Sequence, residues 1–223
     1  MLKNNMLLLK GAIFDMDGVI VNTVPLHFKA WKKMFGEYGK KFTFLDYRMK
    51  VDGIPRSSGV RAVLTGLSKE ELEKASEKKQ RYFLEFLEKE GIKVYKDTVD
   101  LVKRLKGNNV KTAVISSSKN CRYVLKKAKL TGLFNAIIAG SDVKKGKPHP
   151  DIFLLAAARL RLKPKECVVF EDAVLGIKAA GRAKMRTVGI DRYKNPGKLK
   201  QADLVVNNLR NVSVSKLERL ISL

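Results

Sequence analysis

The stretch Ala12-Ile13-Phe14-Asp15-Met16-Asp17-Gly18 decides the fold prediction, because a short apolar run meets two carboxylates and a glycine. Continuous runs of this length are typical of strands buried on both faces of a parallel sheet. Segments with helical periodicity separate most of the runs, and strands that alternate with helices predict an α/β fold with a doubly wound sheet and right-handed crossovers. The other apolar runs are residues 112–115, 136–139, 168–170, 187–190 and 204–206, and the helical segments include 121–130, 151–160 and 174–183.

A helical pattern interrupts this alternation directly after the first strand, over residues 22–95. Within it, Ser68 and Glu71 have the spacing of a capping box, in which each side chain caps the other residue's backbone at the start of a helix. We therefore predict a helical insert over residues 22–95. The α/β core is predicted to consist of residues 1–21 and 96–223.

The composition excludes several classes of protein. The chain has 223 residues, of which 45% are hydrophobic, so it is neither a disordered chain nor a disulfide-stapled mini-protein. Its net charge of +24 attracts polyanions, whether nucleic acid, anionic membranes or phosphorylated metabolites. Cys121 and Cys167 lie far apart without a C-x-x-C motif, which indicates a reducing, cytoplasmic location. No apolar run approaches the roughly 20 residues of a membrane helix, so we expect no membrane association.

Two pairs of acidic residues follow apolar runs: Asp15 with Asp17, and Glu171 with Asp172. Because ligands of open parallel sheets bind at the carboxyl ends of the strands, we expect both pairs at one edge of the sheet. Clustered carboxylates repel one another and lose hydration unless a cation joins them. Oxygen ligands of this kind suit Mg²⁺, which commonly bridges protein carboxylates to a substrate phosphate. The alternative for either pair alone is an exposed acid at the start of a helix.

Hydroxyl and ammonium groups stand between the two acid pairs. The run Ser-Ser-Ser-Lys-Asn at residues 116–120 follows an apolar run, and Lys147 with Pro148 follows another that ends near Gly140. Hydroxyls, backbone amides at a helix start and a lysine ammonium are the usual groups that hold phosphate. Each alone is also typical of a solvated turn. The order acid pair, serine, lysine, acid pair, each after a strand, indicates a site that binds phosphate.

This order resembles the four motifs of the haloacid dehalogenase superfamily, and more closely its β-phosphoglucomutase branch. The resemblance implies a Rossmann-like core with a helical cap inserted after the first strand, where the insert is predicted independently. We call residues 22–95 the cap. The matching stretches are Phe14-Asp15-Met16-Asp17-Gly18-Val19-Ile20, Gly53-Ile54-Pro55-Arg56, Ser116-Ser117-Ser118-Lys119-Asn120, Gly146-Lys147-Pro148-His149-Pro150-Asp151 and Glu171-Asp172.

The resemblance implies a role for each motif. Asp15 would be the nucleophile that takes the phosphoryl group as an aspartyl phosphate, and Asp17 would be the general acid and base. Ser116 and Lys147 would hold the transferring phosphate, with Ser117 beside them. The implied ligands of Mg²⁺ are Asp15, the backbone carbonyl of Asp17, and Asp172, with Glu171 beside the ion.

The resemblance also implies a second, distal phosphate site, because these mutases hold a bisphosphate. Its residues would be Arg56 from the cap with Ser118, Lys119 and Asn120 from the core. Asp52 stands where some mutases carry a basic residue.

Two further cap residues are candidates for contact with the substrate. His27 matches a histidine at the cap hinge, and the alternative is a satisfied histidine on the helical face of Trp31. Lys78 lies near the position of a cap lysine, and the alternative is a solvated charge run over residues 77–79.

Three hypotheses for the function follow. The first is a cytoplasmic mutase, expected to be a monomer, that converts β-glucose 1-phosphate to glucose 6-phosphate through a bisphosphate. The second is a phosphatase that hydrolyses a small sugar phosphate or a related monoester with the same residues. The third is a polyanion-binding protein on a degenerate enzyme fold, but the basic clusters lack interleaved aromatic residues, and no specific nucleic-acid partner is expected. The expected partner is a small phosphorylated metabolite.

Overall fold

The computed structural model describes residues 9–194, 197 and 199–223, so part of the predicted core segment 1–21 lies outside it. Over the described residues, six parallel strands form one sheet in the order β3-β2-β1-β4-β5-β6. Each predicted apolar run coincides with one of these strands, although the run 136–139 extends one residue beyond its strand, and the α/β fold is confirmed. The strands are β1 Gly11–Asp15, β2 Lys111–Ile115, β3 Ala136–Ile138, β4 Cys167–Glu171, β5 Arg186–Ile190 and β6 Leu204–Val206.

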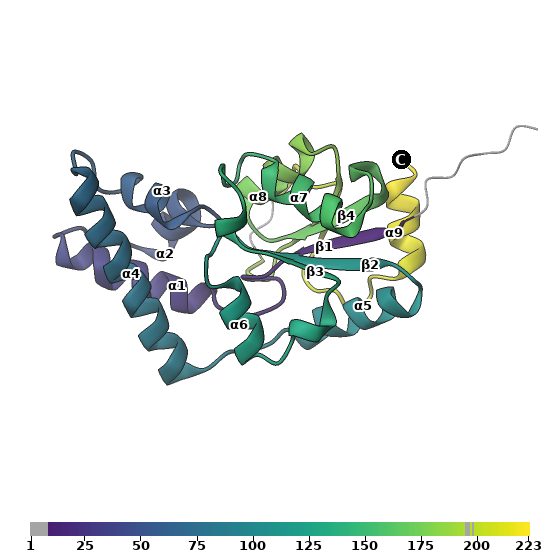
Figure 1. Cartoon of the computed structure of the whole chain (residues 1–223), viewed down its shortest axis with the longest axis horizontal. Helices are drawn as coiled ribbons and strands as arrows, with labels where there is room; N and C mark the ends of the chain where they lie inside the picture. The colour runs from purple at the N-terminus through teal and green to yellow at the C-terminus, as the bar shows by residue number, and fades with distance from the viewer. Residues whose placement is uncertain (1–8, 195–196, 198) are drawn as a thin grey trace, which may run out of the picture.

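Helices cover both faces of the sheet, α5 and α6 on one and α7 and α8 on the other (Figure 1). Successive residues of β1 serve opposite faces, since Phe14 packs in one hydrophobic cluster and Ile13 in the other. This burial on both faces explains the continuous apolar runs. The core helices are α5 Lys96–Gly107, α6 Cys121–Lys127, α7 Asp151–Leu160, α8 Val174–Arg182 and α9 Val214–Ile221, with 3-10 turns η2 Thr131–Leu133, η3 Gly140–Asp142 and η4 Pro164–Glu166.

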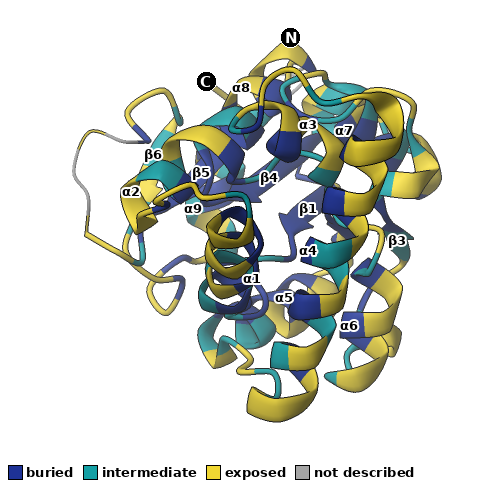
Figure 2. Cartoon of the chain, turned by 90° about the vertical axis from the view of Figure 1, so that its left-hand side faces the viewer, coloured by how far each residue is buried: buried dark blue, intermediate teal, exposed yellow. Residues whose placement is uncertain are grey.

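The cap is helical and lies beside the end of the sheet where β1 and β4 end (Figures 1 and 2). The predicted capping box is present, because the Ser68 hydroxyl accepts from the backbone of Glu71 and the Glu71 carboxylate accepts from the backbone of Ser68. The cap elements are α1 Val24–Glu37, α2 Phe44–Asp46, the π-helix η1 Tyr47–Val51, α3 Arg56–Arg61 and α4 Lys69–Glu90.

The two segments that connect the core to the cap run side by side. Val21 and Val94 form an antiparallel bridge, and the Tyr95 amide donates to the Ile20 carbonyl over 2.9 Å. The helices in the described part of the chain are all too short or too polar to cross a membrane.

Candidate active site

Three buried carboxylates meet at the carboxyl ends of β1 and β4. The pairing of β1 with β4 sets Phe14 opposite Phe170, so Asp15 and Glu171 end their strands at the same level. Asp15, Glu171 and Asp172 are all buried, and one carboxylate oxygen from each lies within 4.8 Å of the others. The structure therefore brings the predicted acid pairs together.

Lys147 inserts its ammonium group between two of these carboxylates. Its Nζ lies 2.6 Å from Asp15 Oδ1 and 3.0 Å from Glu171 Oε2. Burial alone would lower the pKa of Lys147, but the two carboxylates reverse that effect and raise it. Burial and the charge of Glu171 hold the pKa of Asp15 well above its usual range, and burial raises the pKa of Glu171 to about 7. One ammonium thus undercompensates the two carboxylates that it contacts, Asp15 and Glu171.

The donor set of this cluster fits a hard divalent cation. All the side-chain donors are carboxylate oxygens, the ligands that such cations prefer. Glu171 Oε1 is buried and has no hydrogen-bond partner among the described residues. Gly18 makes room for the cluster, because a Cβ at that position would lie 2.4 Å from Asp172 Oδ2, and its φ of +84° also favours glycine. We conclude that the residues present can hold a divalent metal ion.

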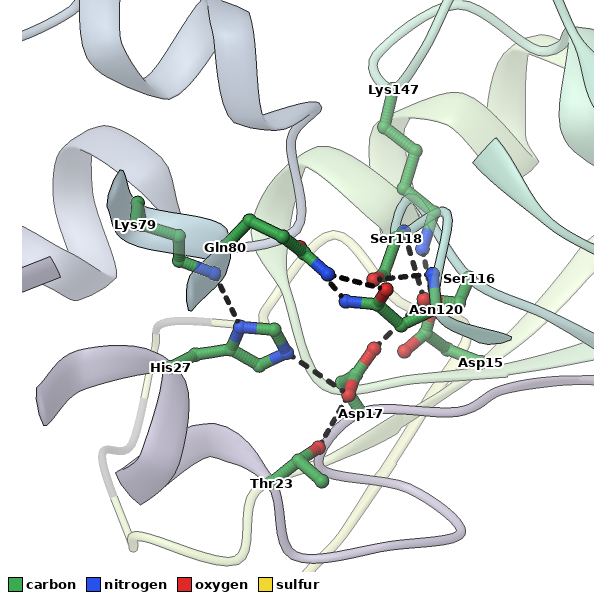
Figure 3. Close-up of polar contacts among 10 residues, drawn as sticks. All are labelled: Asp15, Asp17, Thr23, His27, Lys79, Gln80, Ser116, Ser118, Asn120 and Lys147. Carbon is green, nitrogen blue, oxygen red and sulfur yellow. Dashed lines mark hydrogen bonds and ion pairs between the residues drawn. The ribbon is translucent and has the colours of Figure 1, made fainter. Parts of the chain in front are cut away.

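Asp17 accepts hydrogen bonds from three side chains (Figure 3). The Thr23 hydroxyl donates to Oδ1, His27 Nε2 lies 3.3 Å from the same oxygen, and the Ser116 hydroxyl donates to Oδ2 over 2.8 Å. Burial alone would raise the pKa of Asp17, but His27 and the two hydroxyls outweigh it and lower the pKa to about 2. Asp17 is therefore a carboxylate at neutral pH and is ready to accept a proton.

A chain of contacts links Asp17 to the cap through His27 and Lys79 (Figure 3). Lys79 Nζ lies 2.8 Å from His27 Nδ1, and the His27 ring stacks on Phe83 with 4.1 Å between centroids. Burial and the nearby Lys79 lower the pKa of His27, and burial with the charge of Arg56 lowers the pKa of Lys79 to about 7. A neutral His27 that donates from Nε2 to Asp17 and accepts at Nδ1 satisfies both contacts.

The prediction for Lys78 is not supported by its position. Its ammonium lies 3.0 Å from Glu37 Oε2 on the surface of the cap, and its side chain is 40% exposed. The neighbouring Lys79 faces the site instead and is only 5% exposed. Sequence reasoning missed Lys79, although its spacing of four residues from both Ala75 and Phe83 is the signal of the buried helical face.

A residue that the sequence analysis did not single out connects the residues of the predicted distal phosphate site. Arg56 donates to Gln80 Oε1, and Gln80 and Asn120 pair through two hydrogen bonds of 2.7 and 3.0 Å. The Ser118 hydroxyl accepts from the backbone N–H of Asn120, and Lys119 lines the cavity. Gln80 thus joins the cap arginine to the core loop at residues 118–120.

The hydroxyl of Ser117 is used differently from the prediction. It donates to the Gly53 carbonyl of the cap over 2.7 Å, and so ties the cap to the core. The carboxylate cluster lines one cavity of about 500 Å³ together with Arg56, Ser118 and Lys119 of the distal phosphate site. This volume is suited to a small metabolite.

A family model described as haloacid dehalogenase-like hydrolase matches residues 9–184. The chain belongs to this family. It is therefore an enzyme of the haloacid dehalogenase-like hydrolases, which confirms the resemblance noted in the motifs.

Relatives within the family divide between two activities. A phosphorylated carbohydrates phosphatase of Thermotoga maritima is 33% identical over 199 residues, 85% of this chain and 89% of the relative. A β-phosphoglucomutase of Bacillus subtilis is 32% identical over 218 residues, 94% of both chains. The crystal structure of a β-phosphoglucomutase from Clostridium difficile superposes with a TM-score of 0.86 at 29% identity, covering 96% of this chain and 97% of the other.

The neighbours Lys78 and Lys79 provide a matched pair of variants. Replacing Lys79 with glutamine is expected to lower kcat/KM for a phosphate ester by about 10-fold to 100-fold. His27 then loses its contact with the Lys79 ammonium and no longer holds Asp17 in position. Lys78→Gln removes the same charge from the surface of the same helix and is expected to cost less than about threefold. Steady-state kinetics with both variants checks this prediction, and equal losses would contradict it.

Proposed function

We propose that this haloacid dehalogenase-like enzyme transfers phosphoryl groups of sugar phosphates through an aspartyl phosphate on Asp15. The leading assignment is a β-phosphoglucomutase that converts β-glucose 1-phosphate to glucose 6-phosphate. The observation that carries it is the cavity with two ends. The Asp15 end, beside Lys147, suits the reacting phosphoryl group, and the end lined by Arg56 and Gln80 offers cationic and amide donors for a second one.

The ionised state of Asp17 suits it to act first as a base, which gives the following order of steps. Starting from phosphorylated Asp15, ionised Asp17 accepts the proton of a sugar hydroxyl as that oxygen bonds to phosphorus and the Asp15–phosphorus bond breaks. The resulting bisphosphate reorients in the site so that its other phosphoryl group faces Asp15, and Asp15 attacks that group. Asp17 then returns the proton to the departing ester oxygen, and phosphorylated Asp15 is regenerated.

The remaining residues hold the reacting groups in place. Lys147 would hold the oxygens of the transferring phosphoryl group, and Ser116 positions Asp17 by its hydrogen bond. We propose Mg²⁺ as the divalent ion, held by Asp15, the Asp17 carbonyl and Asp172 with Glu171 beside it. When bound, the ion would stabilise the negative charge of the transferring group.

The cap has a role of its own in this proposal. We propose that residues 22–95 open to exchange substrate and close over it, because the cavity is lined from both the cap and the core.

Both cysteines are free thiols, which supports the proposed cytoplasmic location.

A sugar-phosphate phosphatase is the second candidate, and the relative from Thermotoga maritima favours it. Water would replace the sugar hydroxyl at phosphorylated Asp15, with the same residues in the same roles. Incubation of the enzyme with β-glucose 1-phosphate and Mg²⁺, with and without glucose 1,6-bisphosphate, distinguishes the two. A mutase forms glucose 6-phosphate and is stimulated by the bisphosphate, whereas a phosphatase releases inorganic phosphate and glucose.

Arg56 provides a second test of the mutase assignment. Replacing Arg56 with alanine is expected to lower bisphosphate turnover by about 10²-fold to 10³-fold, roughly 3–4 kcal/mol of transition-state binding. Arg56→Lys is not expected to rescue it, because an ammonium lacks the planar fork of donors. Hydrolysis of acetyl phosphate, which is too small to reach the distal group, is expected to change by less than about threefold.

Arg81→Ala is the matched control, because Arg81 lies on the outer face of α4 with 62% of its side chain exposed. We expect it to leave kcat/KM for both substrates unchanged. A similar, small loss on both substrates in Arg56→Ala would instead favour the phosphatase.

A further inference from the structure

An arginine of the cap reaches the carboxylate cluster from outside. Arg48 lies in the π-helix η1, and only 11% of its side chain is exposed. One terminal nitrogen lies 3.2 Å from Asp172 Oδ2, and the other donates to the Asp172 backbone carbonyl over 3.1 Å. A single guanidinium thus holds both the side chain and the backbone of a residue that we assign to the cation site.

The surroundings of Arg48 fix its position and balance its charge. Asp52, one helical turn further on, lies 2.7 Å from the same guanidinium, and the Tyr193 ring lies 5.3 Å from it. Burial alone would lower the pKa of Arg48, but Asp172 and Asp52 raise it, so the group stays charged. The negative charge of Asp52 balances the positive charge of Arg48. The pair therefore brings directed donors to Asp172 without adding net positive charge beside the cation site. This pairing also accounts for an acid at position 52, where some mutases carry a basic residue.

The contact depends on how the cap and core are packed. Arg48 and Asp52 belong to the cap, whereas Asp172 and Tyr193 belong to the core. The Ser117–Gly53 hydrogen bond joins the same two parts next to Asp52. Moving the cap away from the core therefore removes both Arg48 donors from Asp172, and closing the cap restores them.

We propose that Arg48 is a positioning residue that couples closure of the cap to the orientation of Asp172, with Asp52 as its counter-ion. The inference rests on the proposed function for the motion of the cap and for the cation site. Because coupling between two equilibria is reciprocal, closure strengthens cation binding, and cation binding favours closure.

Simple electrostatics predicts the opposite effect of removing Arg48 on the affinity for the cation, so the two explanations can be distinguished by experiment. If Arg48 only competed with the cation for Asp172, its removal would leave the site more negative and would tighten cation binding. If Arg48 orients Asp172, its removal weakens cation binding although a positive charge has been deleted. Loss of a group that orients a metal ligand typically lowers affinity by about 10-fold to 100-fold.

Calorimetric titration with Mn²⁺ alone, without any phosphate ester, measures this sign. We expect Arg48→Gln to weaken Mn²⁺ binding by about 10-fold. Arg48→Lys keeps the charge and is expected to lose nearly as much, because one ammonium cannot serve both acceptors of Asp172. Lys50→Gln is the control, since Lys50 is exposed on the same π-helix and pairs with Asp46, and its Mn²⁺ affinity is expected to match the wild type.

Small-angle scattering supplies a second measurement on the same proteins. Mn²⁺ is expected to reduce the radius of gyration of the wild type and of Lys50→Gln, but not that of Arg48→Gln or Arg48→Lys. Unchanged or tighter Mn²⁺ binding in Arg48→Gln, or equal contraction in all four proteins, would overturn the proposal. Because no phosphate ester is present, this outcome is separate from the mutase assay, whose failure would count against the proposed function instead.

Discussion

Replacing Lys147 with methionine is expected to lower the free energy of unfolding by about 3–5 kcal/mol and to abolish turnover. The variant keeps most of the side-chain volume but leaves Asp15 and Glu171 buried without their shared ammonium group. Urea denaturation at pH 7 in the absence of divalent cations measures the loss. Lys145→Met is the matched control, because Lys145 is exposed in the same loop, and its stability is expected to equal that of the wild type.

The pH dependence of the Lys147→Met variant checks the cause. Burial already raises the pKa of Glu171 to about 7 in the wild type, against a usual value of 4.5. A carboxyl whose folded-state pKa is raised binds more protons when folded, so its contribution to stability is present at low pH and is lost as the pH rises through about 7. Loss of the ammonium raises this pKa further.

We therefore expect the Lys147→Met variant to regain stability when the pH falls from 7 to 5, and to gain more from added Mg²⁺ than the wild type does. If the stability of the variant were insensitive to both pH and Mg²⁺, the carboxylate repulsion would not be the cause of the loss.

Asp15→Asn is expected to remove activity by roughly 10⁴-fold to 10⁶-fold, as loss of one member of a catalytic unit does in other enzymes. An amide oxygen is too weak a nucleophile to take a phosphoryl group. The fold is expected to survive, because the substitution is isosteric and relieves repulsion between Asp15 and Glu171. Rates with acetyl phosphate and a sugar phosphate, together with the melting temperature, test both parts. Activity within tenfold of the wild type would refute the role of Asp15.

The fold was predictable because strands buried on both faces of a parallel sheet have continuous apolar runs in their sequence. Runs such as Ala12–Phe14 and Val168–Phe170 are continuous, short and followed at once by acidic residues. Since parallel strands end at one edge of the sheet, the meeting of Asp15 with Glu171 and Asp172 follows from the fold. No side-chain detail was needed for that step.

The contacts between the cap and the core were not predictable in the same way. Arg48 contacts Asp172 across 124 residues of sequence, and Gln80 contacts Asn120 across 40. Neither residue stands in a motif, and each looks like an ordinary polar residue of a helix. Their roles arise from how the cap packs on the core, which local patterns do not record.

Lys79 was missed in the sequence for a different reason. Both lie in one charge run, and only the helical phase separates them. The apolar residues Ala75 and Phe83 set that phase, so the buried position was available from the pattern. The abundance of lysine in this chain hid it, because a buried lysine is uncommon unless it has a partner such as His27.

Asp15 is proposed to carry the phosphoryl group, and chemical trapping identifies the residue that does so. Enzyme loaded from acetyl phosphate in the presence of Mg²⁺ is quenched and treated with borohydride, which reduces an aspartyl phosphate to homoserine, and the peptides are sequenced by mass spectrometry. We expect homoserine at residue 15 in the wild type and no modified peptide in Asp15→Asn. Reduction at another carboxylate, or a stable phosphate on Ser116 or His27, would contradict it.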